Sequence, residues 1–254
     1  MKQLIFKTLN SLGYELRKKV APQLKPKPLY YQTEPFLSIT NHVGEFTMTN
    51  LDRLQGLFLG VNYLVDNGIE GDFVECGVWR GGSSMAAALT FMSKKQPNRK
   101  IWMYDTYEGM AETTEHDLDP NGYLAADIIK RSDKSNPRSI FCVASFEDVE
   151  ANMKSTGYPM ENVKFVKGKV EDTLKSDIPE KIAFLRLDTD YYTSTKAEME
   201  ILYDKLVPGG VLILDDYGHW QGARKAVDDY FELKGKKPLF SFLDYAGVIA
   251  IKPL

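Results

Sequence analysis

Short apolar segments with the character of buried strands alternate along this chain with longer segments of helical periodicity. The expected strands are residues 73–76, 101–104, 163–166, 182–187 and 211–214. Parallel neighbouring strands need crossover connections, which are usually helices, so this alternation predicts a parallel sheet with helices on both faces. We therefore expect a doubly wound α/β domain.

The last part of the chain departs from this alternation. Apolar runs at residues 239–242 and 248–251 are separated only by a short segment with the spacing of a hairpin. The final strand should therefore lie antiparallel beside the strand before it. Residues 53–254 are expected to form the domain, and residues 1–52 an N-terminal basic arm or cap, with an extended stretch around its prolines.

Composition and charge limit the class of protein. With 43% apolar residues, 26% charged residues and two cysteines, the chain is expected to be globular, soluble and cytoplasmic. No apolar run is long enough to span a membrane, and a net charge of −3 predicts no affinity for nucleic acid. Residues 1–27, however, carry seven Lys or Arg residues against Glu15 alone. We expect this arm to pack on a second subunit or to contact an anionic membrane.

A glycine-rich loop follows the first expected strand and opens a helix. Its sequence over residues 75–82, ECGVWRGG, lacks both the dinucleotide fingerprint and the Gly-Lys-Ser/Thr of a phosphate loop. The carboxylate of Glu75 at the strand tip would repel a pyrophosphate but attract a sulfonium group. Asp105 ends the second strand, where an acidic side chain suits ribose hydroxyls. The pair predicts a nucleoside ligand with positive charge in place of phosphate, which fits S-adenosylmethionine.

Two pairs of aspartates end two later strands of the expected sheet. Asp188 and Asp190 follow one strand, and Asp215 and Asp216 follow the next. Carboxylates crowded at one sheet edge are costly unless a cation or protons neutralise them. Oxygen ligands without clustered histidines favour Mg²⁺. Helix capping would explain one of these aspartates but not two pairs, so the sequence predicts a magnesium site.

The chemistry expected of such a site is methyl transfer to a hydroxyl. A metal ion lowers the pKa of a bound hydroxyl, and a neighbouring carboxylate can then take the proton. A vicinal diol can chelate the ion, which would hold one oxygen in line with the sulfonium methyl group. Asp188 is our candidate for both metal ligand and general base. His219, shortly after Asp216, is a candidate for substrate contact or for an alternative base.

These motifs resemble the macrocin O-methyltransferase (TylF/MycF) family. The resemblance rests on residues 71–82, 185–188 and 209–217, and it covers about residues 45–254. It implies a class I Rossmann-like methyltransferase that uses S-adenosylmethionine and Mg²⁺ to methylate a sugar hydroxyl. The metal ligands that it implies are Asp188, Asp215 and Asp216, with Asp188 as the base. The cofactor-binding residues that it implies are Thr47, Met48, Glu75, Gly77, Trp79, Ser83, Asp105, Ser145 and Asp172.

Residues 108–137 fit the strand–helix plan least well. They are expected to form a lid or binding segment, or a solvated loop with a short helix at 123–131. The resemblance fades in residues 1–44 and 110–137, so the acceptor stays open among sugars, sugar nucleotides, lipid-linked glycans and antibiotic glycosides. Three other functions also stay open: a catechol-type O-methyltransferase, a non-catalytic module that binds a nucleoside or a partner, and a nicotinamide-dependent dehydrogenase. A homo-oligomer through the arm is a further expectation.

Overall fold

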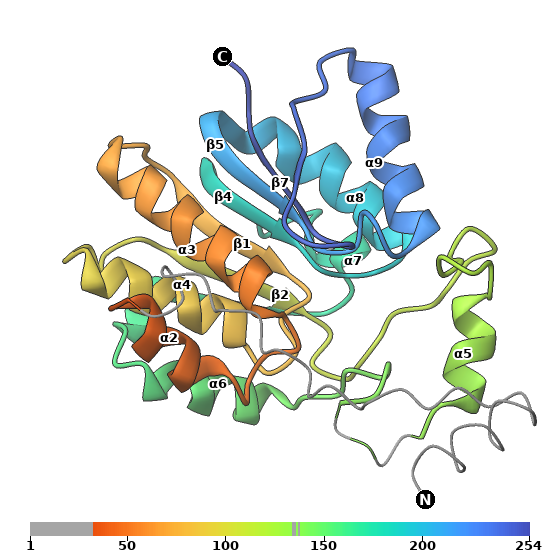
Figure 1. Ribbon diagram of the computed structural model, residues 1–254, viewed down its shortest axis with the longest axis horizontal. Coiled ribbons are helices and arrows are strands. Elements are labelled where there is room, and N and C mark those ends of the chain that lie inside the picture. Colours follow the sequence, from red (N-terminus) through yellow and green to blue (C-terminus); the bar gives the residue numbers. More distant parts are fainter. Residues whose placement is uncertain (1–32, 134–135, 137) are drawn as a thin grey trace, which may run out of the picture. The chain divides into compact units, whose positions relative to one another are not determined.

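The computed structural model describes residues 33–133, 136 and 138–254, which form one compact unit from Thr33 onward. The expectations for residues 1–27 lie outside the described residues. A seven-stranded sheet runs through this unit in the order β3-β2-β1-β4-β5-β7-β6 (Figure 1). Its strands are β1 Asp72–Cys76, β2 Ile101–Asp105, β3 Val163–Lys167, β4 Ile182–Leu187, β5 Leu206–Leu214, β6 Ser241–Phe242 and β7 Val248–Ile251.

The sheet has the predicted mixture of strand directions. Strands β1 to β5 pair in parallel, whereas β7 is antiparallel to both β5 and β6. The expected C-terminal hairpin is therefore confirmed. Within this hairpin, β7 rather than β6 pairs with β5. Strand β5 therefore has a partner along each edge, and β6 is the last strand of the sheet.

Helices cover both faces of the sheet, as the alternation predicted (Figure 1). Strand residues with side chains on one face, such as Leu185 and Leu212, pack with α8 and α9 in one apolar cluster. On the opposite face Gly60 of α3 lies directly over Phe184, where a Cβ atom would come within 2.7 Å of the ring. The helices are α2 Phe36–Val43, α3 Leu51–Asp66, α4 Gly82–Ser93, α5 Ala125–Arg131, α6 Phe146–Ser155, α7 Val170–Thr173, α8 Tyr192–Leu202 and α9 Gln221–Lys234. Among the described residues, no helix has the length and apolar character needed to cross a membrane.

Helix α2 was not predicted from the sequence. It begins directly after Pro35 and buries Phe36, Ile39 and Val43. The ring of Phe36 packs on Phe58 of α3, with 5.3 Å between the ring centroids. The packed unit thus includes residues that the sequence analysis assigned to the arm, while the domain division at residue 52 stays a prediction.

The segment after β2, expected to be a lid, a binding segment or a solvated loop, is fixed to the domain by Asp117. This side chain is fully buried, and one of its oxygens accepts hydrogen bonds from the backbone N–H and the hydroxyl of Thr114. The other oxygen accepts the backbone N–H of Tyr192 at 2.7 Å, at the first residue of α8. A single antiparallel bridge then joins Leu118 to Leu124, and the short helix expected at 123–131 follows as α5.

Candidate active site

Strand register brings the predicted residues to one edge of the sheet. Leu187 at the end of β4 pairs with Cys76 of β1 on one side and with Leu214 of β5 on the other. The next residue along each strand therefore lies at the same edge, which places Asp188 between the glycine loop and Asp215. This edge opens into a cavity of about 220 Å³. The predicted site residues that line the cavity are Thr47, Met48, Glu75, Gly77, Trp79, Ser83, Asp105, Asp188, Asp215 and Asp216.

Two residues predicted to bind the cofactor lie outside the cavity lining. Ser145 is the N-cap of α6, where its hydroxyl accepts the backbone N–H of Asp148 at 3.1 Å. Asp172 lies in the first turn of α7 and pairs with Lys175 in solvent. Its neighbour Glu171 lines the cavity instead, because successive residues of a helix point in different directions.

The glycine loop is shaped by close backbone contacts. Gly77 has φ +78°, and a Cβ atom there would lie 2.0 Å from the carbonyl oxygen of Asp188, so only glycine fits. The carboxylate of Asp105 accepts backbone N–H groups from Val78 at 2.7 Å, from Trp79 at 3.1 Å and from Tyr107 at 2.8 Å. Burial raises the pKa of Asp105, and these three bonds oppose the rise. Asp105 thus fastens the loop to the end of β2.

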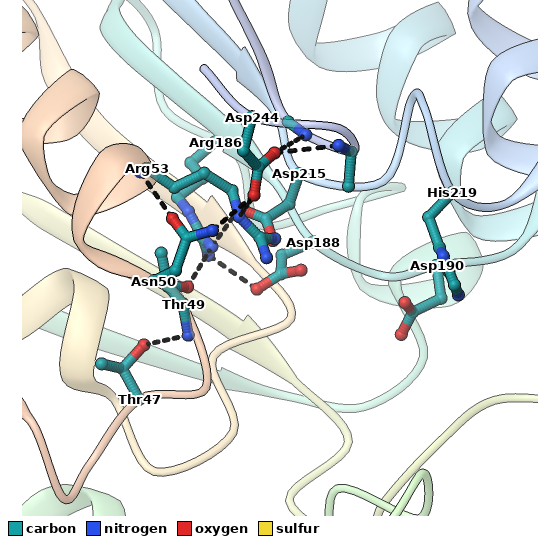
Figure 2. Close-up of polar contacts among 12 residues, drawn as sticks. Thr47, Thr49, Asn50, Arg53, Arg186, Asp188, Asp190, Asp215, His219 and Asp244 are labelled. Atoms are coloured by element: carbon teal, nitrogen blue, oxygen red, sulfur yellow. Dashed lines mark hydrogen bonds and ion pairs between the residues drawn. The ribbon is translucent and has the colours of Figure 1, made fainter. Parts of the chain in front are cut away.

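The carboxylates at the sheet edge are held by an arginine that the sequence analysis did not select. Arg186 of β4 is 2% exposed, and its Nη1 donates to Glu75 at 2.5 Å. The same Nη1 donates to Asp188 Oδ2 at 2.8 Å (Figure 2). Its Nη2 donates to Asp215 and, at 2.9 Å, to the hydroxyl of Thr49. Burial raises the pKa of Glu75, and the charge of Arg186 opposes that rise. Of the three carboxylates that Arg186 contacts, Glu75 is the most deeply buried.

A second arginine, Arg53 of α3, was also missed. Its Nη1 contacts Asp215 Oδ2, and its Nε lies 3.0 Å from Asp244 in the loop between β6 and β7 (Figure 2). Asn50 caps α3 by accepting the backbone N–H of Arg53, and its amide donates to Asp244 at 2.6 Å. The start of α3, the end of β5 and the C-terminal hairpin therefore meet at the guanidinium group of Arg53.

The residues at this edge fit a divalent cation. Asp188, Asp215 and Asp216 each offer an oxygen, and these atoms lie within 4.8 Å of one another. Asp216 Oδ2 is buried and has no hydrogen-bond partner in the part of the chain described. At this edge of the cavity, carboxylates outnumber guanidinium groups by five to two. The carboxylates belong to Glu75, Asp188, Asp190, Asp215 and Asp216, and the guanidinium groups to Arg53 and Arg186. An oxygen-only donor set with excess negative charge suits Mg²⁺.

Burial raises the pKa values of Asp216, in this cluster, and of Asp190 beside it. Asp190 reaches a pKa of about 7, first through burial and then through the charge of Asp188. The pKa of Asp216 is raised by burial and by the charges of Asp190 and Asp215. Asp190 is turned toward Trp220, whose indole N–H donates to it at 2.9 Å. A cation would lower the cost of ionising this group of carboxylates.

Comparison with known proteins identifies the family. The sequence profile of the macrocin O-methyltransferase (TylF) family matches residues 38–251. The chain belongs to this family. The match spans the whole sheet and every residue of the carboxylate network described above.

Several named O-methyltransferases are similar to this chain over most of its length. The chain is 34% identical to the 8-demethyl-8-(2,3-dimethoxy-alpha-L-rhamnosyl)-tetracenomycin-C 4'-O-methyltransferase of Streptomyces olivaceus, over 80% of this chain and 74% of that protein. It is 29% identical to the mycinamicin III 3''-O-methyltransferase of Micromonospora griseorubida, over 80% and 76%. The structure of the O-methyltransferase NovP superposes with a TM-score of 0.73 at 26% identity, over 89% and 99%. The predicted fold and the prediction of an O-methyltransferase are confirmed.

His219 does not line the cavity of this TylF-family chain. It lines a separate groove between residues 115–120 and the start of α9. Its ring packs edge-on against Trp220 and Tyr245, with centroids 4.9 Å and 5.8 Å away, and burial lowers its pKa. In the view of Figure 2 it lies beyond Asp190 as seen from Asp188. The backbone N–H of His219 donates to the carbonyl oxygen of Asp216 at 2.9 Å, but among the described residues no hydrogen bond joins its imidazole to the three clustered carboxylates. Its catalytic role stays a prediction.

A buried carboxyl group next to the loop that follows β4 predicts that the stability of the protein depends on pH. Glu198 of α8 accepts the hydroxyl of Thr189 at 3.0 Å, and burial raises its pKa from 4.5 to about 8. Between these values the folded chain holds a proton that the unfolded chain has released. The contribution of Glu198 to stability is therefore present at low pH and falls by about 1.4 kcal/mol per pH unit as the pH rises through this window. We expect Glu198→Gln to remove this slope.

Urea unfolding of wild type and Glu198→Gln at several pH values from 5 to 9 would measure the effect. The difference in unfolding free energy should grow in favour of the variant as the pH rises. Curves that stay parallel across this range would show that Glu198 is ionised in the folded protein.

Proposed function

We propose that this chain transfers the methyl group of S-adenosylmethionine to a hydroxyl of a sugar or glycoside, with Mg²⁺ as the metal. The observation that carries the proposal is the single cavity that joins the glycine loop to Asp188, Asp215 and Asp216. The names of relatives add support, since the Streptomyces olivaceus enzyme is named for a rhamnosyl compound. A sulfonium cofactor also suits a cavity in which carboxylates outnumber guanidinium groups.

The cofactor side of the cavity offers unsatisfied polar atoms. Trp79 Nε1 and Glu171 Oε2 are both buried without a hydrogen-bond partner in the described structure, although both residues line the cavity. A buried donor and a buried acceptor left open are costly unless a ligand pairs with them. S-adenosylmethionine carries both an acceptor carboxylate and donor amino groups, and it supplies a methyl group activated by a sulfonium. Thr47 and Met48 would cover it from the N-terminal segment.

The metal side provides the groups for proton transfer. Asp188, Asp215 and Asp216 would hold Mg²⁺, which lowers the pKa of a bound hydroxyl. Arg186 holds Asp188 through Oδ2 alone, so in the described structure Oδ1 carries no hydrogen bond and can accept the proton of the acceptor hydroxyl. The side chain of Asp188 is 28% exposed, which lets an acceptor reach it. Asp188 is therefore the proposed general base.

The acceptor proposed here is a sugar with two neighbouring hydroxyls, because a vicinal diol can chelate the cation through both oxygens. A cytoplasmic location stays a prediction, as does contact of residues 1–27 with a second subunit or a membrane.

An aromatic diol would satisfy the same metal geometry as a sugar diol, so a catechol serves as the competing acceptor in the test.

The test compares methyl transfer to a methyl rhamnoside, to its analogue that lacks one of the neighbouring hydroxyls, and to a catechol. We expect methylated product by mass spectrometry from the intact rhamnoside, loss of turnover with EDTA, and recovery on addition of Mg²⁺. Calorimetric binding of S-adenosylhomocysteine checks the cofactor site separately. Preference for the catechol would overturn the sugar acceptor, and absence of cofactor binding would overturn the whole proposal.

A further inference from the structure

The side chain of Arg53 is shared between two carboxylates. Its Nη1 contacts Asp215 Oδ2 and its Nε lies 3.0 Å from Asp244, while the arginine side chain is only 14% exposed. The other oxygen of Asp215 is held by Arg186. Both oxygens of this proposed metal ligand are therefore engaged by guanidinium groups (Figure 2).

A divalent cation on the aspartate cluster competes with one of these two arginines. Positive charges that share one carboxylate oxygen repel each other strongly where water is excluded. Arg186 is fixed, since it is 2% exposed and also holds Glu75, Asp188 and Thr49. Arg53 lies in the first turn of α3 and has a second carboxylate within reach. Arg53 is therefore the arginine that can leave Asp215 when a cation binds.

The carboxylate of Asp244 is held by its own hydrogen bonds in a position where it can bind Arg53. Its Oδ1 accepts the backbone N–H groups of Ala246 at 2.9 Å and Gly247 at 2.6 Å, and Asn50 donates to its Oδ2. These bonds hold the carboxylate in place whichever way the arginine moves. Gly247 also makes room for the arginine stem, because a Cβ atom there would lie 2.6 Å from Arg53 Cδ.

We propose that Arg53 is a positioning residue that takes the place of the cation on Asp215 when no metal is bound, and that metal binding moves it fully onto Asp244. This inference rests on the metal site of the proposed function. It also links two parts of the site, because Arg53 lies only four residues after Thr49, the last residue of the segment 47–49 that lines the cofactor cavity. Metal binding and the arrangement of that segment are then coupled.

The proposal predicts opposite changes in metal affinity for two variants. Arg53→Met removes the competitor of the cation, so Mg²⁺ should bind roughly tenfold more tightly. Asp244→Asn removes the alternative partner, so Arg53 should stay on Asp215 and Mg²⁺ should bind roughly tenfold more weakly. Calorimetric titration of the full chain with Mg²⁺, with no acceptor present, measures both. A merely structural role of the arginine would weaken binding in both variants.

Matched variants separate this effect from general destabilisation. Lys94→Met removes the ion pair with Asp66, far along the chain from the carboxylate cluster, and should leave the Mg²⁺ affinity unchanged. Arg53→Lys keeps one positive charge and should lie between wild type and Arg53→Met. Should Arg53→Met not fold, Arg53→Lys takes its place: Mg²⁺ binding tighter than that of wild type supports the proposal, and unchanged or weaker binding overturns it.

Two further outcomes are distinguishable. Weaker Mg²⁺ binding by both Arg53→Met and Asp244→Asn overturns the role of Arg53 but keeps the metal site. No Mg²⁺ binding by any protein, including wild type that still binds S-adenosylhomocysteine, overturns this inference together with the metal part of the proposed function.

Discussion

Replacing Asp188 with Asn is expected to lower kcat for methyl transfer by roughly a thousandfold, within the range measured for loss of a general base. The amide has the shape of the carboxylate but cannot take the proton of the acceptor hydroxyl, and it is a weaker ligand for a hard cation. The contact of Arg186 with Oδ2 can survive, because the side-chain oxygen of Asn accepts the same hydrogen bond. The loss should therefore appear in turnover rather than in folding.

Three measurements on Asp188→Asn separate these effects. Steady-state kinetics gives kcat, thermal unfolding tests the fold, and calorimetry with S-adenosylhomocysteine tests the cofactor site. Asp66→Asn is the matched control, since Asp66 is exposed and pairs only with Lys94 in the described structure. Turnover by Asp188→Asn within tenfold of wild type would remove Asp188 from the role of base.

The second large effect is expected in stability, from Arg186→Met. This change leaves Glu75, Asp188 and Asp215 without the guanidinium that lies between them. Breaking a buried ion pair by removing one partner typically costs about 3–5 kcal/mol, because an uncompensated charge stays behind. We expect a loss of that size in the free energy of unfolding, measured in urea at neutral pH.

A double variant tests the physical reason for this loss. Glu75→Gln in the Arg186→Met background removes the most deeply buried of the uncompensated charges, so part of the stability should return. Arg80→Met serves as the comparison, because the pair of Arg80 with Asp148 is about a third exposed and such pairs contribute about 1 kcal/mol or less. A loss no larger for Arg186→Met than for Arg80→Met would show that the inner carboxylates are protonated.

The sheet could be predicted from sequence because its strands are short, apolar and regularly spaced. The segment 182–187 coincides with β4, and 211–214 is the C-terminal part of β5, since a buried parallel strand needs apolar side chains on both faces. The first residues of β5, which include Pro208, Gly209 and Gly210, lack that apolar character. Helix α2 was missed for a physical reason. It spans only two turns, so its apolar residues are too few to show helical periodicity, and the prolines before it favoured an extended chain.

The aspartates of the site could be predicted for the same reason as the sheet, since they follow directly on its strands. The two arginines differ in this respect. Arg186 interrupts an apolar strand, and since a buried charge requires partners, its position in the sequence is itself a signal of a buried ion pair. Arg53 meets Asp215 across 162 residues of chain, and nothing in the local pattern around either residue indicates that contact. Local periodicity specifies elements, whereas such pairs depend on how the elements pack.

The insertion of β7 between β5 and β6 sets an order of events during synthesis. A ribosome makes β5, with Asp215 at its end, well before it makes β7 and the loop that carries Asp244. Until then one edge of β5 lacks its hydrogen-bonding partner and is open to pairing with other chains. Arg53, made earlier still, has only one of its two carboxylates available. The nascent chain therefore completes its carboxylate network only when the C-terminal hairpin has emerged.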